Sequence, residues 1–267
     1  MFSFEYKKLD FSHKLGTASF PEDDFGKHIH YFYEIVYFVN GNVTYSVESE
    51  SRDLETGNLI LIKPGQVHFA TVNDDETYER YVLKFPETIL PDYLKEKLST
   101  IGPFFYKPRP LSYIFEKLDD YVKRYNQDEV HTLFECELLR LCVFISNELS
   151  LESHNTNPRI LEILEYIDAN IDGDLSVKTI SDLFNYNISY ISHEFKKVMR
   201  VSIFNYVRSK RVFYAHQLIL NGTKTQDAAI KAGFYDYSTF YRSYIKVMGC
   251  KPADHNIYRI ICFFFYI

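Results

Sequence analysis

The first 85 residues show short alternations of apolar and polar positions that are typical of β-strands. An aromatic and β-branched run covers residues 30–39, and residues 40–42 (Asn-Gly-Asn) follow it as a predicted hairpin turn. Residues 43–47 alternate between apolar and polar, residues 59–62 are apolar throughout, and residues 78–85 have the composition of a further strand. This pattern predicts a small β-barrel or jelly roll over residues 1–85.

Prolines interrupt the chain next, at five positions between residues 86 and 110. We expect an irregular segment there, with a short helix near residues 93–98. Two amphipathic helices are predicted between residues 113 and 149, so that 86–150 is an irregular segment followed by a helical hairpin. The apolar faces of this hairpin are candidates for dimerisation, or could equally pack back on the barrel. Polar residues 151–157 form a predicted linker.

From Asn157 onward the apolar spacing is helical. Asn157 can cap a helix and Pro158 fits its first turn, so a helix is predicted to begin here. Further helices are predicted at about residues 177–184, 189–199, 203–220, 225–232 and 238–247. The remaining residues, 257–267, form an apolar tail that is too short to span a bilayer and whose role the sequence does not indicate.

This helical half contains an internal repeat. Lys197-Val198-Met199 recurs 49 residues later as Lys246-Val247-Met248, and Asn185-Tyr186 aligns with Gly233-Phe234. Each copy is a short helix, a turn at Asn or Gly, and a second helix. Asn and Gly tolerate left-handed backbone angles, so the layout is that of a helix-turn-helix, although a plain bundle of helical hairpins would share it.

The segment between the copies favours DNA binding. An 18-residue helix at 203–220 is about 27 Å long, which suits two recognition helices that enter major grooves about 34 Å apart. Residues 158–256 are therefore predicted to be a double helix-turn-helix domain for double-stranded DNA. The candidate DNA contacts are Ser189, Tyr190, Ser192, His193, Lys196, Lys197, Arg208, Ser238, Thr239, Tyr241 and Arg242. Among them Arg242 could donate two bonds to a guanine, whereas the two lysines suit phosphates.

The charge distribution agrees with this division. Residues 1–156 hold 16 Lys and Arg against 26 Asp and Glu, for a net charge of −10, whereas residues 157–267 hold 14 against 10, for +4. A basic half can face phosphates. The four cysteines form no CxxC pair, no apolar run has the length of a membrane helix, and residues 1–10 are polar, so we expect a cytoplasmic protein with no membrane contact.

Histidines and a carboxylate mark the N-terminal half. His28, His30 and Glu34 share one face of a predicted strand, and His68 follows a Pro-Gly turn. The four residues could hold a divalent metal, could bind a ligand together with Tyr37, or could be structural core residues. A sugar would stack on aromatic rings and hydrogen-bond to Glu34 and the histidines. No cofactor is otherwise required.

The C-terminal half, residues 157–254, resembles the DNA-binding domain of the AraC/XylS family. The resemblance lies in residues 189–196 and in a second motif made of Gly233-Phe234, Phe240, Arg242 and Pro252. The sequence departs from the family pattern at His193 and Arg200, where Arg and Gly are usual. The resemblance implies a transcription regulator, controlled by a small molecule, that contacts RNA polymerase, forms a homodimer and more often activates than represses.

The histidine spacing in the N-terminal half is similar to that of the cupin barrel, which often precedes this DNA-binding domain. Together the two resemblances imply an α+β chain that is not an enzyme. It would join a cupin-like barrel and a helical dimerisation segment to an all-α domain with two helix-turn-helix motifs. Two alternatives stay open: a metal-dependent cupin enzyme, and a regulator that acts through protein contacts with a degenerate DNA-binding surface.

Overall fold

A computed structural model describes most of the chain, namely residues 2–6, 9–16, 28–73, 77–105, 112–147, 157–254 and 263–264. The chain divides into two compact units, which are built mainly from the residues before and after the predicted linker. Residues 151–156 of that linker and most of the tail 257–267 lie outside the described residues. In the described part of the chain, no helix has the length and apolarity that a membrane crossing requires.

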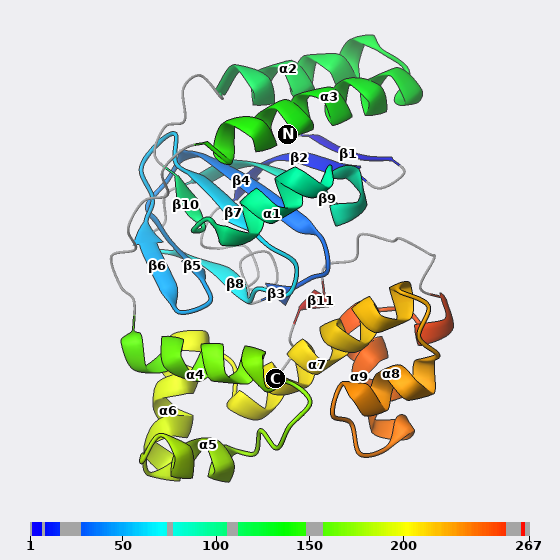
Figure 1. Ribbon diagram of the computed structural model, residues 1–267. Helices are drawn as coiled ribbons and strands as arrows, with labels where there is room; N and C mark the ends of the chain where they lie inside the picture. Colours follow the sequence, from blue (N-terminus) through cyan, green and yellow to red (C-terminus); the bar gives the residue numbers. More distant parts are fainter. Residues whose placement is uncertain are drawn as a thin grey trace. The chain divides into compact units, whose positions relative to one another are not determined.

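The β-strands, most of which belong to the first unit, form two sheets (Figure 1). The strands are β1 (Phe2–Tyr6), β2 (Leu9–Gly16), β3 (His28–Ile29), β4 (Tyr33–Asn40), β5 (Val43–Val47), β6 (Glu50–Asp53), β7 (Leu59–Ile62), β8 (His68–Val72), β9 (Tyr78–Phe85), β10 (Phe104–Phe105) and β11 (Phe263–Phe264). One sheet has the order β1-β2-β9-β4-β7-β10 and the other β11-β3-β8-β5-β6. The predicted β-rich fold is confirmed, but the described strands form two sheets and not one closed barrel.

The two faces of the larger sheet serve two separate cores. Along β4, Tyr33 and Ile35 belong to one buried cluster, whereas Val36 and Phe38 belong to the other. Successive side chains of a strand point to opposite faces, so a strand that is apolar at nearly every position is covered on both sides. Residues of β5, including Tyr45, join the second cluster, which therefore fills the space between the sheets.

Three helices cover the outer face of the larger sheet (Figure 1). They are α1 (Asp92–Thr100), α2 (Ser112–Arg124) and α3 (Gln127–Ile145), and a short 3₁₀ turn, Glu87–Ile89, precedes them. Phe115 of α2 and Phe134 of α3 are buried against Phe11 of β2. The apolar faces of the predicted hairpin thus pack on the sheet, which answers the alternative that the sequence left open. Whether another surface of the hairpin forms a dimer stays a prediction.

The second unit is helical. Its elements are α4 (Pro158–Ala169), α5 (Val177–Leu183), α6 (Ile188–Met199), α7 (Ile203–Leu220), α8 (Thr225–Lys231), α9 (Tyr237–Met248) and a 3₁₀ turn at Pro252–Asp254. Five of these helices lie within one residue of their predicted bounds. Asn157 caps α4 as expected, since its side chain accepts the N–H of Ile160 at 3.3 Å. The predicted all-α half is therefore confirmed.

Candidate nucleic-acid interface and effector cluster

The two helix-turn-helix motifs, α5–α6 and α8–α9, use the same backbone geometry. The turn residues Asn185 and Gly233 both have positive φ, 55° and 79°. The recognition helices α6 and α9 also end alike, at Arg200 (φ 55°) and Gly249 (φ 67°). Arg200 therefore adopts the left-handed conformation that a glycine would adopt more easily, as expected from the departure noted in the sequence.

The recognition helices bury equivalent stripes. Ile191, Phe195 and Met199 are buried in α6, and Phe240, Tyr244 and Met248 occupy the positions 49 residues later in α9. Asn187 caps α6 and Asp236 caps α9. The Asp236 carboxylate accepts the N–H of Thr239 at 2.7 Å, and this bond lowers the pKa of Asp236. The caps fix where each recognition helix begins.

The predicted DNA contacts lie outside these buried stripes. Seven are exposed: Ser189, Tyr190, His193, Lys196, Lys197, Ser238 and Arg242. Four are partly buried: Ser192, Arg208, Thr239 and Tyr241. Hydroxyl, imidazole and guanidinium groups can read base edges, and ammonium groups can neutralise phosphates. The structure thus leaves both recognition helices with polar side chains that solvent can reach.

One contact to a recognition helix was not predicted from the sequence. Arg159 of α4 donates a hydrogen bond to the Tyr190 hydroxyl at 2.8 Å, and its guanidinium lies 5.9 Å from the centre of the Tyr186 ring. Tyr190 is 42% exposed, so this bond orients a side chain that otherwise faces solvent. The helix N-terminal to the first motif therefore helps to position a candidate DNA contact.

The linking helix α7 joins the two motifs through Arg211. Its guanidinium donates to the carbonyls of Ile171 at 3.0 Å and Gly173 at 2.6 Å, in the segment that precedes α5. The same guanidinium packs on Gly233, where an added Cβ would come within 2.9 Å of Cζ. Burial lowers the pKa of Arg211. Position 233 therefore requires a glycine for two reasons, namely its positive φ and the close approach of the Arg211 guanidinium.

A second buried contact joins α7 to α9. His216 Nδ1 and the Tyr244 hydroxyl lie 2.6 Å apart, and both side chains are buried. Neither residue was predicted to have a role. A buried polar pair needs such a bond because desolvation of an unsatisfied group is costly. The bond fixes the second recognition helix relative to the linking helix.

A charged cluster lies within the first unit. Glu34 of β4 is buried and stands directly opposite Lys84 of β9 in the strand register. Glu34 Oε2 lies 3.9 Å from Lys84 Nζ and 3.8 Å from His68 Nε2. His68 Nδ1 lies 3.0 Å from the carbonyl of Gln66, which can only accept, so Nδ1 is the donor.

The structure brings some of the predicted ligand residues together. His30, Glu34 and His68 are buried, and each offers one potential metal-ligand atom within 4.8 Å of the others. Tyr37 does not join them. It lies an odd number of residues from Glu34, so its ring points to the opposite face and stacks on Phe115. His28 is part of β3, but its side chain lies outside the described residues.

Two further polar side chains accompany this cluster along β9. Arg80 is buried, and its guanidinium lies 4.2 Å from the centre of the Tyr78 ring. Burial raises the pKa of Tyr78 well above its usual value. Burial also raises the pKa of Asp10, which pairs with Lys84 across the β2–β9 ladder. Buried ionisable groups of both signs therefore gather on the interior side of the larger sheet.

Comparison with known proteins assigns a domain to each half. A family model described as the AraC-like ligand binding domain matches residues 12–141, and one for a helix-turn-helix domain matches residues 180–256. The thermoregulatory protein LcrF of Yersinia pestis is 24% identical over 239 residues, which is 83% of this chain and 88% of LcrF. The virulence regulon transcriptional activator VirF of Yersinia enterocolitica matches with the same identity and coverage. The uncharacterized HTH-type transcriptional regulator YdiP of Escherichia coli is 22% identical over 266 residues, 94% of this chain and 88% of YdiP.

Fold, motifs and matches together define a class of protein, a transcription regulator that joins a ligand-binding domain to a helix-turn-helix domain. The chain belongs to the AraC family of transcription regulators. Its relatives are named as regulators, and this chain is likewise a regulator and not an enzyme.

Proposed function

We propose that this regulator reads a specific double-stranded DNA sequence with α6 and α9 together. The observation that carries this proposal is the repeated geometry of the two motifs. Both have the same turn and the same buried stripe, and both leave polar side chains exposed on the recognition helix. His193 and Arg242 occupy equivalent exposed positions, 49 residues apart. Each could contact base edges in its own major groove.

The effector is a small organic molecule with several hydroxyl groups, such as a sugar, that binds at Glu34. This choice is supported by the buried polar side chains around the carboxylate. Lys84 already places a positive charge 3.9 Å from Glu34, so the carboxylate does not need a metal ion to balance its charge. Hydroxyl groups can donate to Glu34 and accept from Lys84, whereas a divalent cation would repel Lys84. A divalent metal held by His30, Glu34 and His68 is the competing occupant.

The chain acts as a homodimer and an activator that contacts RNA polymerase. Support for activation comes from VirF, whose name describes a transcriptional activator. A dimer would place two copies of the double motif on adjacent DNA sites and would add their binding energies. The effector would then change how the two halves of the regulator present themselves to DNA.

Selection of genomic fragments by the purified full chain, followed by sequencing at two salt concentrations, tests the DNA proposal. Discrete sites with spaced half-sites at both concentrations are the expected result. Binding that spreads over all fragments and disappears with added salt would reduce the interaction to phosphate contact and would defeat the proposal.

Calorimetry with a sugar panel tests the effector proposal. We expect one sugar to bind to the wild type and to bind much more weakly to the Glu34→Gln variant, which keeps the side chain's size. Metal analysis of the same samples decides between the occupants. A stoichiometric transition metal in the wild type that is lost in Glu34→Gln would show that the site holds a metal and not a sugar. Equal sugar binding by the two proteins would show that Glu34 does not contact the sugar.

A further inference from the structure

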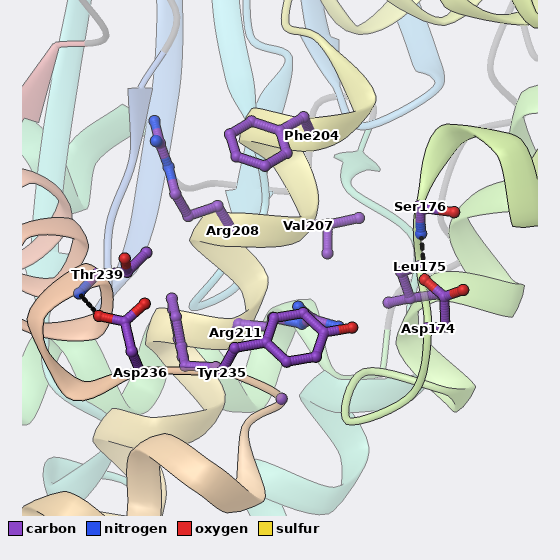
Figure 2. A pocket seen from close by; sticks show the side chains of 12 residues that line it. Asp174, Leu175, Ser176, Phe204, Val207, Arg208, Arg211, Tyr235, Asp236 and Thr239 are labelled. Atoms are coloured by element: carbon purple, nitrogen blue, oxygen red, sulfur yellow. Dashed lines mark hydrogen bonds between the residues drawn. The ribbon is translucent and has the colours of Figure 1, made fainter.

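A groove in the helical unit crosses the first half of α7 (Figure 2). Its volume is about 250 Å³, which is the space of about eight water molecules. Phe204, Val207, Arg208 and Arg211 form its floor and follow one stripe of α7, since they are spaced by three and four residues. The segment before α5 walls one side and the turn between α8 and α9 walls the other.

The apolar surface of the groove suits a flat ring. Figure 2 shows Phe204 at one end of the groove and Tyr235 at the other. Both rings are unusually open to solvent for aromatic side chains, at 64% for Phe204 and 93% for Tyr235. Val207, which is buried, lies between them as part of the floor. A ring bound here would cover exposed aromatic surface at both ends.

The charged groups of the groove favour an anion. Asp174 and Asp236 line it, but both carboxylates already accept hydrogen bonds from the starts of α5 and α9. Arg208 differs, because among the described residues its guanidinium makes one hydrogen bond, from Nη2 to Asn205 Oδ1 at 2.7 Å. The same guanidinium lies 5.3 Å from the centre of the Phe204 ring. Its Nε and Nη1 groups keep donor capacity. Burial also lowers the pKa of Arg208, as expected for a cation with reduced access to water.

We propose that this groove is a second effector site, in the DNA-binding domain itself, for a small aromatic carboxylate. The ring lies on Val207 between Phe204 and Tyr235, and the carboxylate accepts hydrogen bonds from Arg208. Ligands of about a dozen heavy atoms match the volume, and an affinity near 1 mM or tighter is expected for that size.

Occupancy of this site opposes DNA binding. This part rests on the proposed function, because Arg208 and Thr239 line the groove and are also candidate DNA contacts. A carboxylate on Arg208 takes the donors that a phosphate would use. The linkage is reciprocal, so bound DNA also lowers the affinity of the groove for the carboxylate ligand.

Heteronuclear NMR titration of the full chain tests the site without DNA. The probe is indole-3-acetate, and indole-3-acetamide is its neutral match. We expect saturable binding of indole-3-acetate. The affinity for indole-3-acetamide should be at least tenfold lower, because the amide cannot accept a charge-assisted hydrogen bond from Arg208. Arg208→Gln should lower the affinity for indole-3-acetate by at least tenfold, and Tyr235→Ala should lower it by about fivefold. Lys231→Gln, at an exposed cation of α8 outside the groove, should bind as the wild type does.

Three results would overturn the site: no saturable binding, equal binding of the acetate and the amide, or unchanged binding in both groove variants. The DNA competition is measured separately on a selected DNA fragment. The acetate at ten times its Kd should lower DNA affinity about tenfold in the wild type, and should do so much less in Tyr235→Ala. Equal DNA affinity with and without saturating acetate would overturn the competition. If the chain selects no specific DNA, the proposed function fails, and the titration still decides the site.

Discussion

Replacement of Gly233 by Ala should destabilise the helical unit more than the same replacement at Gly222. Both glycines follow a helix with positive φ, 79° and 87°, and both N–H groups donate to a carbonyl three residues back at 2.9 Å. They differ in their surroundings. An added Cβ at Gly222 meets no atom of the described residues within 4 Å, whereas at Gly233 it meets the Arg211 guanidinium at 2.9–3.0 Å.

The expected difference follows from what Arg211 must give up. A left-handed alanine costs about 1–2 kcal/mol at either site, and part of this is offset because alanine restricts the unfolded chain. These effects cancel between the two variants. At Gly233 the guanidinium must also move, and its two hydrogen bonds to backbone carbonyls are lengthened or lost. The additional cost is about 2 kcal/mol.

Urea unfolding followed by far-ultraviolet circular dichroism measures the free energy of unfolding of each variant. The Gly233→Ala protein should unfold at the lower urea concentration, with Gly222→Ala between it and the wild type. In an Arg211→Ala background the steric partner is gone, so the two glycine variants should then differ by less than about 0.5 kcal/mol. Equal destabilisation with Arg211 present, or an undiminished difference without it, would refute the role given to this contact.

Three further substitutions test single bonds. Arg159→Ala should lower DNA affinity about fivefold without changing thermal stability, because it frees Tyr190; unchanged fluorescence anisotropy titrations would speak against this. Tyr244→Phe should lower the free energy of unfolding by about 1–3 kcal/mol, because it removes the hydroxyl bonded to His216. A variant whose urea unfolding midpoint equals that of the wild type would contradict this. Asp236 has a lowered pKa, so its stabilising bond is fully present above pH 3.8 and lost as the pH falls through the lowered pKa. The stability difference between wild type and Asp236→Asn should therefore shrink in acid, and a difference independent of pH would exclude the carboxylate.

The helices were predictable because their signals are local. Capping residues and apolar spacing fall within a few residues of each other, as at Asn157 and along α6. Because the motif occurs twice, each copy also supports the prediction made for the other. The left-handed conformation of Arg200 was also foreseeable, because it stands at the position where the other copy has Gly249. Such features depend on neighbours in the sequence.

The sites depend on pairings that the sequence does not display. Glu34 was visible as a candidate, but Lys84 was not, because their contact requires β4 and β9 to be neighbours in the sheet. Strand order is set by long-range packing. The bonds of Arg159 to Tyr190 and of His216 to Tyr244 likewise join residues 31 and 28 positions apart. Strand alternation alone predicts that Tyr37 and Glu34 lie on opposite faces of β4.

A base-substitution scan across one selected DNA site tests the central claim most directly. Affinity is measured for every base change with the wild type, His193→Ala and Arg242→Ala. The account predicts two sensitive segments about 10 base pairs apart, one of which loses its base preference in His193→Ala and the other in Arg242→Ala. A single sensitive segment, or the same segment affected by both variants, would contradict the claim that the two motifs read successive major grooves.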